Sequence, residues 1–140
     1  MSFSLKNLPE RSAKPRAEGI TLVLDKGYSV RQAEDLVEVC SGHIDIVKLG
    51  WGTSYVTQGL EEKIKVYQNA GIPVYFGGTL FEAYLMRNQL SDYRKLMERY
   101  DITHVEVSNG TILLSDEKKQ AIIKELSNDY TVYSEVGSKN

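Results

Sequence analysis

Charged residues stand at the ends of four short apolar runs in the sequence. Asp25 follows the first run and Lys48 the second, while Glu106 and Glu135 lie within or just after the last two. A charged residue at the end of a buried strand does not improve the packing of the core, so these residues are candidates for catalysis or ligand binding. Three carboxylates facing one cavity would repel one another unless cations neutralised them. Because Mg²⁺ accepts a few oxygen ligands together with water, Asp25, Glu106 and Glu135 predict a magnesium site.

A second interpretation of these carboxylates needs no metal ion. Lys26, Lys48 and Lys139 would then neutralise them in a salt-bridge network, and structural ion pairs perturb carboxylates much as active sites do. The spacing of the residues does not decide between the two interpretations.

Glycine-rich segments follow the apolar runs. Gly77-Gly78-Thr79 and the segment 50–54 offer backbone N–H groups and hydroxyls of the kind that bind phosphate or carboxylate oxygens. Neither segment matches a Walker loop or a complete GxGxxG fingerprint, and glycine is equally required in tight turns. With the residues that follow the fourth run, these segments supply the candidate substrate ligands Thr53, Ser54, Gly78, Thr79, Ser108 and Asn109.

The elements that must position these residues alternate along the chain. Helical periodicity separates the apolar, β-branched runs, and Ser29 with Gln32 forms a capping-box pattern. Ser115 opens a later helix, and Ser91 is a possible cap for another. This alternation predicts an α/β fold of parallel βα repeats, with about four helices and five strands at 20–24, 44–47, 72–76, 105–107 and 130–133. We expect residues 1–18 to form an N-terminal arm and residues 19–140 the βα domain.

The side chains of a strand point alternately to its two faces, so each charged residue can be assigned to a face. In parallel α/β folds the loops after the carboxyl ends of the strands build the ligand site. We expect one face to carry the pairs Val23 and Asp25, Ile46 and Lys48, Glu106 and Ser108, and Tyr133 and Glu135.

Length and composition restrict the classes of protein. A chain of 140 residues suits one domain, and 17 basic against 19 acidic residues give no basic field for nucleic acid or an anionic membrane. The single cysteine, Cys40, leaves no internal disulfide. The start lacks the apolar region of a signal peptide, and no apolar run reaches about 18 residues. We expect a cytoplasmic protein that does not span a membrane.

Five segments are spread over residues 19–139, in the order "GITLVLDKG", "IDIVKLGWGTS", "VYFGGTLFE", "VEVSNGT" and "SEVGSK". Together they resemble the phosphosulfolactate synthase family. The resemblance implies a TIM (β/α)8 barrel that adds sulfite to phosphoenolpyruvate to give 2-phospho-3-sulfolactate, with Mg²⁺ as cofactor. It is compatible with coenzyme M biosynthesis or with sulfolactate production.

The resemblance also implies roles for individual residues. Lys139 matches the lysine that looks like the proton donor, and Lys48 is the second candidate catalytic residue. Glu106 and Glu135 fall where acidic metal ligands are expected, with Asp25 as a third. The substrate's carboxylate and phosphate would be met by Lys48 and by Lys26, Lys14 and Arg16.

A TIM barrel needs about 200 residues or more, so the chain would supply only about the first five strands. An open sheet leaves two unprotected edges, and we therefore expect a homo-oligomer. Two alternatives to the synthase remain: a non-catalytic half-barrel that self-associates, and an enzyme that uses another phosphorylated enol acid.

Overall fold

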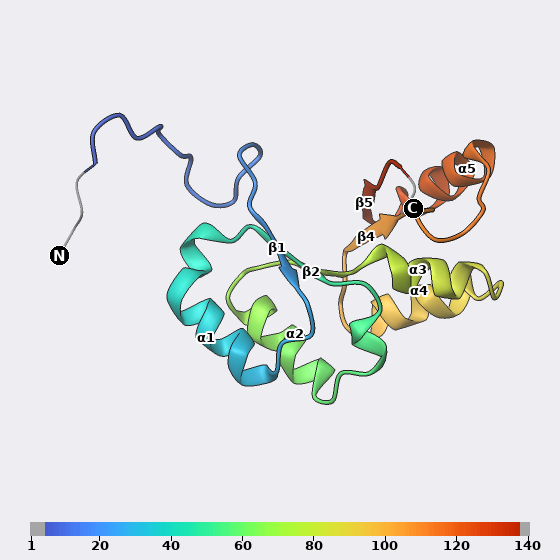
Figure 1. The fold of residues 1–140 in the computed structure, drawn as a ribbon, viewed down its shortest axis with the longest axis horizontal. Helices are drawn as coiled ribbons and strands as arrows, with labels where there is room; N and C mark the ends of the chain where they lie inside the picture. The colour runs from blue at the N-terminus through green and yellow to red at the C-terminus, as the bar shows by residue number, and fades with distance from the viewer. Residues whose placement is uncertain (1–4, 138–140) are drawn as a thin grey trace.

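The computed structural model describes residues 5–137, and that part of the chain contains five α-helices and five strands. Figure 1 shows how these elements are arranged. The amino-terminal portion comprises β1 (Leu22–Asp25), α1 (Val30–Cys40), β2 (Ile46–Leu49), α2 (Leu60–Asn69) and β3 (Val74–Phe76). It is followed by α3 (Gly78–Leu85), α4 (Leu90–Arg99), β4 (His104–Val107), α5 (Asp116–Leu126) and β5 (Thr131–Ser134). The short 3-10 turns Ser41–His43 and Thr53–Tyr55 follow α1 and β2.

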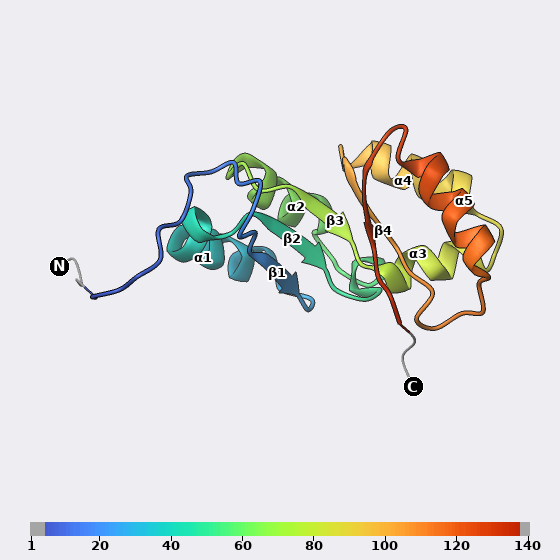
Figure 2. The same ribbon diagram turned by 90° about the horizontal axis from the view of Figure 1, so that it is seen from above.

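The strands form two small parallel sheets. One has the order β1-β2-β3 and the other pairs β4 with β5, while β3 and β4 contact each other at the junction (Figure 2). The predicted parallel βα repeats are confirmed. The expected helix count of about four is too low, because the connection between β3 and β4 holds both α3 and α4. The described strands do not close a barrel.

Local sequence accounts for where the helices begin. The amide N of Gln32 donates to Ser29 Oγ at 3.2 Å and the amide N of Ser29 donates to Gln32 Oε1 at 2.9 Å, so the predicted capping box is confirmed. Ser115 caps α5 by accepting from the amide of Lys118. The expected cap at Ser91 is wrong, since α4 already begins at Leu90.

The core lies between the strands and the helices. The fully buried side chains Val47, Phe76, Val105 and Val107 belong to the strands, and helical residues such as Ile64, Tyr67, Tyr93 and Met97 pack in the same cluster. Burial of these apolar side chains holds each βα unit together. None of the helices in the described part of the chain is long and apolar enough to cross a membrane.

Residues 5–19 contain no helix or strand and bind at the amino end of β2. Arg16 Nη1 lies 2.6 Å from Asp45 Oδ1, and Arg11 Nη2 lies 3.1 Å from Asp45 Oδ2. Lys14 Nζ donates to the carbonyl oxygen of Ser41 at 3.0 Å. These contacts fix the segment at the end of the sheet opposite to the carboxyl ends of the strands.

Candidate functional site

A pocket of about 310 Å³ opens at the carboxyl ends of the strands. Strands β1, β2, β4 and β5, the loops after β2 and β5 and the first turn of α3 contribute to it. The lining residues are Leu24, Lys48, Trp51, Gly78, Thr79, Glu106, Tyr133, Ser134 and Glu135. Residues from both sheets therefore meet at one site, as expected for parallel βα repeats.

Lys48 lies between two carboxylates in this pocket. Its ammonium is 2.7 Å from Glu106 Oε2 and 2.8 Å from Glu106 Oε1, and 3.9 Å from Glu135 Oε2. The Glu106 side chain is 5% exposed, whereas those of Lys48 and Glu135 are 20% and 33% exposed. The trio carries a formal charge of −1 and combines a buried carboxylate with two charged groups that a ligand can reach.

Glycine at position 78 allows α3 to begin directly against this ion pair. The Gly78 amide donates to Glu106 Oε1 at 3.0 Å. A Cβ atom at this position would lie 2.2 Å from Ser108 Oγ and 2.5 Å from Glu106 Oε1, distances that no side chain tolerates. Glycine is therefore required here for close approach rather than for a special backbone angle.

Two tyrosines lie next to Glu106, and the sequence pattern had indicated only one of them, Tyr133. The rings of Tyr75 and Tyr133 stack at 5.3 Å between centroids. Burial raises the pKa of the Tyr75 phenol strongly, and the neighbouring Glu106 carboxylate adds to this effect. Tyr75 therefore stays protonated beside the Glu106 carboxylate. The feature of the sequence that could have indicated Tyr75 is its position in the middle of the short apolar run 74–76.

The predicted position of Asp25 is wrong. Backbone pairing places Leu24 opposite Lys48, so Asp25 belongs to the other face of the sheet. There its carboxylate is fully buried, 3.1 Å from the ammonium of Lys63 and 3.0 Å from the hydroxyl of Tyr67, both on α2. Alternation along one strand does not fix its register against the next, so the pattern of β1 alone does not show which face of the sheet Asp25 shares with Lys48.

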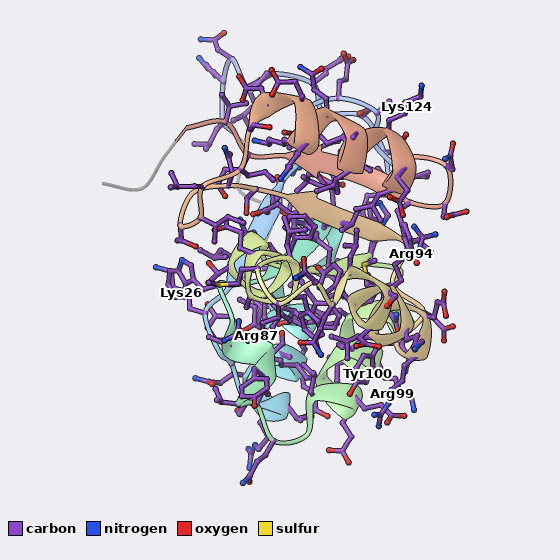
Figure 3. The ribbon with its side chains drawn as sticks, turned by 90° about the vertical axis from the view of Figure 1, so that its right-hand side faces the viewer. Lys26, Arg87, Arg94, Arg99, Tyr100 and Lys124 are labelled. Carbon is purple, nitrogen blue, oxygen red and sulfur yellow. The ribbon has the colours of Figure 1, made fainter. Side chains whose placement is uncertain are left out.

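The other predicted cations lie apart from the pocket or at its rim. Lys14 and Arg16 bind at the amino end of β2, so the expectation that they face the substrate is wrong. Lys26, on the β1–α1 loop, lies at the edge of the molecule (Figure 3). Its ammonium is 5.7 Å from the ring centre of Trp51. Lys139 lies outside the described residues.

The predicted substrate ligands divide into two groups. Gly78 and Thr79 line the pocket. The other four are engaged within the protein or buried. The Thr53 hydroxyl donates to the Gly50 carbonyl oxygen, Ser54 is buried, the Ser108 hydroxyl donates to Glu82, and Asn109 Oδ1 accepts from Lys119.

Glu82 on α3 is a buried carboxylate that sequence analysis missed. It accepts from the amides of Gly110 (3.0 Å) and Thr111 (2.8 Å) and from the hydroxyls of Ser108 and Thr111. Burial alone would raise the pKa of this carboxyl, but the hydrogen bonds outweigh it and hold the pKa below the usual 4.5. Glu82 thereby fixes the β4–α5 loop beside the pocket.

The carboxylates that remain at the pocket are few. Among residues 5–137, no group of three or more histidine, cysteine, aspartate or glutamate side chains is placed to hold a metal ion. With Asp25 on the other face, the set of possible ligands reduces to Glu106 and Glu135. One or two carboxylates with water and substrate oxygens are a normal ligand set for Mg²⁺, so the donor chemistry fits this cation.

Parallel βα repeats with a polar pocket at the carboxyl ends of the strands define an α/β protein with a ligand site at the strand ends. A family model described as (2R)-phospho-3-sulfolactate synthase (ComA) matches residues 9–140. The chain belongs to this phosphosulfolactate synthase family.

Named relatives agree with the family match. The chain is 40% identical over 138 residues to phosphosulfolactate synthase of Bacillus subtilis, a match that covers 99% of this chain and 54% of that protein. It is 41% identical over 124 residues to phosphosulfolactate synthase of Methanocaldococcus jannaschii, covering 86% of this chain and 49% of that protein. The chain thus spans about half the length of the curated relatives it matches.

Proposed function

We propose that this chain carries part of the active site of a phosphosulfolactate synthase, a lyase that joins sulfite to phosphoenolpyruvate. The observation that carries the proposal is the ammonium of Lys48, held between Glu106 and Glu135 in a pocket at the strand ends. Family membership supports the identity of the two substrates.

The proposed reaction forms one carbon–sulfur bond and one carbon–hydrogen bond. The sulfur lone pair of sulfite attacks the methylene carbon of phosphoenolpyruvate, and the electron pair of the double bond moves toward the substrate carboxylate as an enediolate-like species. A proton then adds to the neighbouring carbon, which gives 2-phospho-3-sulfolactate. Lys48 would stabilise the negative charge that develops on the carboxylate, because a fixed cation in a partly dry pocket acts strongly there.

Two further roles are proposed for charged residues. Glu106 and Glu135 would hold Mg²⁺, which would add positive charge beside the same carboxylate. The resemblance to the family supports Lys139 as the proton donor. Gly78 and Thr79, at the start of α3, are the candidates for contact with substrate oxygens, because a helix N-terminus favours anions.

The test measures sulfite-dependent consumption of phosphoenolpyruvate by this chain, with and without Mg²⁺. We expect Mg²⁺-dependent turnover, and Lys48→Met should lower kcat/KM by about 10²- to 10³-fold. Lys65→Met is the matched control, since Lys65 is exposed on α2 and pairs only with exposed Glu61 among the residues described. Unchanged turnover in Lys48→Met would contradict the role of this residue. Failure of the unmodified chain to bind phosphoenolpyruvate in calorimetry would contradict the proposed function.

A second candidate function is self-association of a half-barrel. Within the described residues β1 and β5 each pair on one side only, and Leu22 on β1 is 44% exposed. Open strand edges favour pairing with another chain. We propose a homodimer or larger assembly, and analytical ultracentrifugation at micromolar concentration tests it. A clean monomer would count against this assembly.

A further inference from the structure

Lys119 joins two loops beside the pocket. It lies on α5, which packs against β4 and β5 (Figure 2). Only 9% of the surface of Lys119 is exposed. Its ammonium donates to Asn109 Oδ1 at 3.0 Å and to the backbone carbonyl oxygen of Glu135. One side chain therefore connects the loop after β4 to the loop after β5.

The Asn109 end of this connection is itself fixed. Ser108 and Gly110, the neighbours of Asn109, both donate to the buried carboxylate of Glu82. Glu82 belongs to α3, whose first residue also donates to Glu106. The loop that receives Lys119 is therefore anchored to the helix that borders the pocket.

The Glu135 end leads directly to the charged trio. The amide of Glu135 donates to the Val107 carbonyl oxygen at 3.2 Å, and its own carbonyl oxygen accepts from Lys119. With both backbone groups held, the carboxylate reaches to 3.9 Å from the Lys48 ammonium. The hydrogen bond from Lys119 thus helps to fix the backbone of Glu135, which follows β5 and places its carboxylate in the pocket.

We propose that Lys119 is a positioning residue that fixes Glu135 against Lys48, with Asn109 as its second anchor. This inference rests on the proposed function. Both acceptors of the Lys119 ammonium are neutral oxygens. Burying a charge on such partners adds little net stability over an apolar side chain of similar length. The main effect of the two hydrogen bonds is therefore to fix the geometry of the pocket. Their loss should lower turnover more than it lowers the free energy of unfolding.

The experiment compares Lys119→Met with Lys118→Met, the exposed neighbour on the same helix. In amide hydrogen exchange, Lys119→Met should reduce protection of the Glu135 amide while leaving the amides within α5 protected. In the turnover assay it should lower kcat by about 10- to 100-fold, with a smaller change in KM, because a displaced group costs this much in rate. Lys118→Met should match the unmodified chain in both measurements.

A double-mutant cycle separates positioning from general structural damage. If Lys119 acts through Glu135, then Lys119→Met should lower kcat by less than about twofold in a Glu135→Gln background, because linked changes are not additive. Full additivity would overturn the inference. If the unmodified chain neither turns over nor binds phosphoenolpyruvate, the proposed function fails; without turnover, hydrogen exchange alone decides the positioning role. Unchanged protection of the Glu135 amide in Lys119→Met would then overturn it.

Discussion

The buried ion pair between Lys63 and Asp25 offers a sharp test of how the first sheet is stabilised. Both side chains are almost completely buried, at 1% and 0% exposure, and their charges lie 3.1 Å apart. Lys63→Met would remove the ammonium while keeping a side chain of similar length. The carboxylate of Asp25 would then remain inside the protein without a positive partner.

The magnitude follows from the remaining partners of Asp25. Its carboxylate would still accept from the amides of Gly27 (2.8 Å) and Tyr28 (2.7 Å) and from the hydroxyl of Tyr67 (3.0 Å). Removing one partner of a buried pair costs about 3–5 kcal/mol, and three surviving donors place this case near the low end, at about 3 kcal/mol. For a chain of this size such a loss lowers Tm by about 10 °C.

The assay is equilibrium unfolding in urea, followed by circular dichroism, with Lys65→Met as the matched control. Lys65 lies on the same helix but pairs with Glu61 at the surface, where water and salt screen an ion pair and its contribution to stability is small. Adding Asp25→Asn to Lys63→Met should restore part of the stability, because no uncompensated charge would remain. Equal effects of the two lysine substitutions, or a double variant less stable than Lys63→Met, would refute this reasoning.

Three further predictions concern packing and pH. Gly78→Ala should lower the free energy of unfolding by about 1–3 kcal/mol, because its methyl group would overlap Ser108, whereas Gly42→Ala, with open space around it, should change it by less than about 0.5 kcal/mol; equal losses would contradict the close approach of α3. Burial lowers the pKa of His104 below 6.5, so its contribution to stability is complete above pH 6.5 and is lost as pH falls toward the lowered pKa. In His104→Gln the free energy of unfolding should therefore depend less on pH over this interval. If the free energy of unfolding changes with pH as steeply in the variant as in the unmodified chain, His104 is not the source of this dependence. Glu82→Gln should cost about 1–3 kcal/mol near pH 7, since charge-assisted hydrogen bonds are lost. Because the pKa of Glu82 is depressed, its contribution to stability is present above about pH 4.5 and is lost at lower pH. The free energy of unfolding of Glu82→Gln should therefore fall less steeply than that of the unmodified chain when the pH is lowered below about 4.5.

The sequence predicted local elements well and long-range contacts poorly. The capping box at Ser29 was readable because both of its partners lie within four residues of each other. The predicted meeting of Lys48 and Glu106 at one site also holds, since both end parallel strands. Asp25 was placed on the wrong face because the register between β1 and β2 is set by packing and hydrogen bonds that a single strand does not encode.

Glu82 and Arg16 have tertiary partners that sequence patterns do not predict. Glu82 sits within a helix as an ordinary-looking glutamate, and only the approach of the β4–α5 loop reveals that it is buried and holds four hydrogen bonds. Arg16 was expected to meet the substrate from the family resemblance, whereas it binds Asp45 at the opposite end of the sheet. The sign of a side chain's charge can be read from the sequence, but which residue it pairs with depends on the tertiary structure.

The sequence by itself determined the βα repeats, the family and the end of the sheet at which charged residues gather, because periodicity, caps and strand-end positions are local features of the chain. Tertiary structure alone decided which charges face the pocket and which are neutralised beneath the helices. The physical reason is that strand register and helix packing depend on contacts between residues 20 to 60 positions apart, such as Lys48 with Glu106 and Asp25 with Lys63.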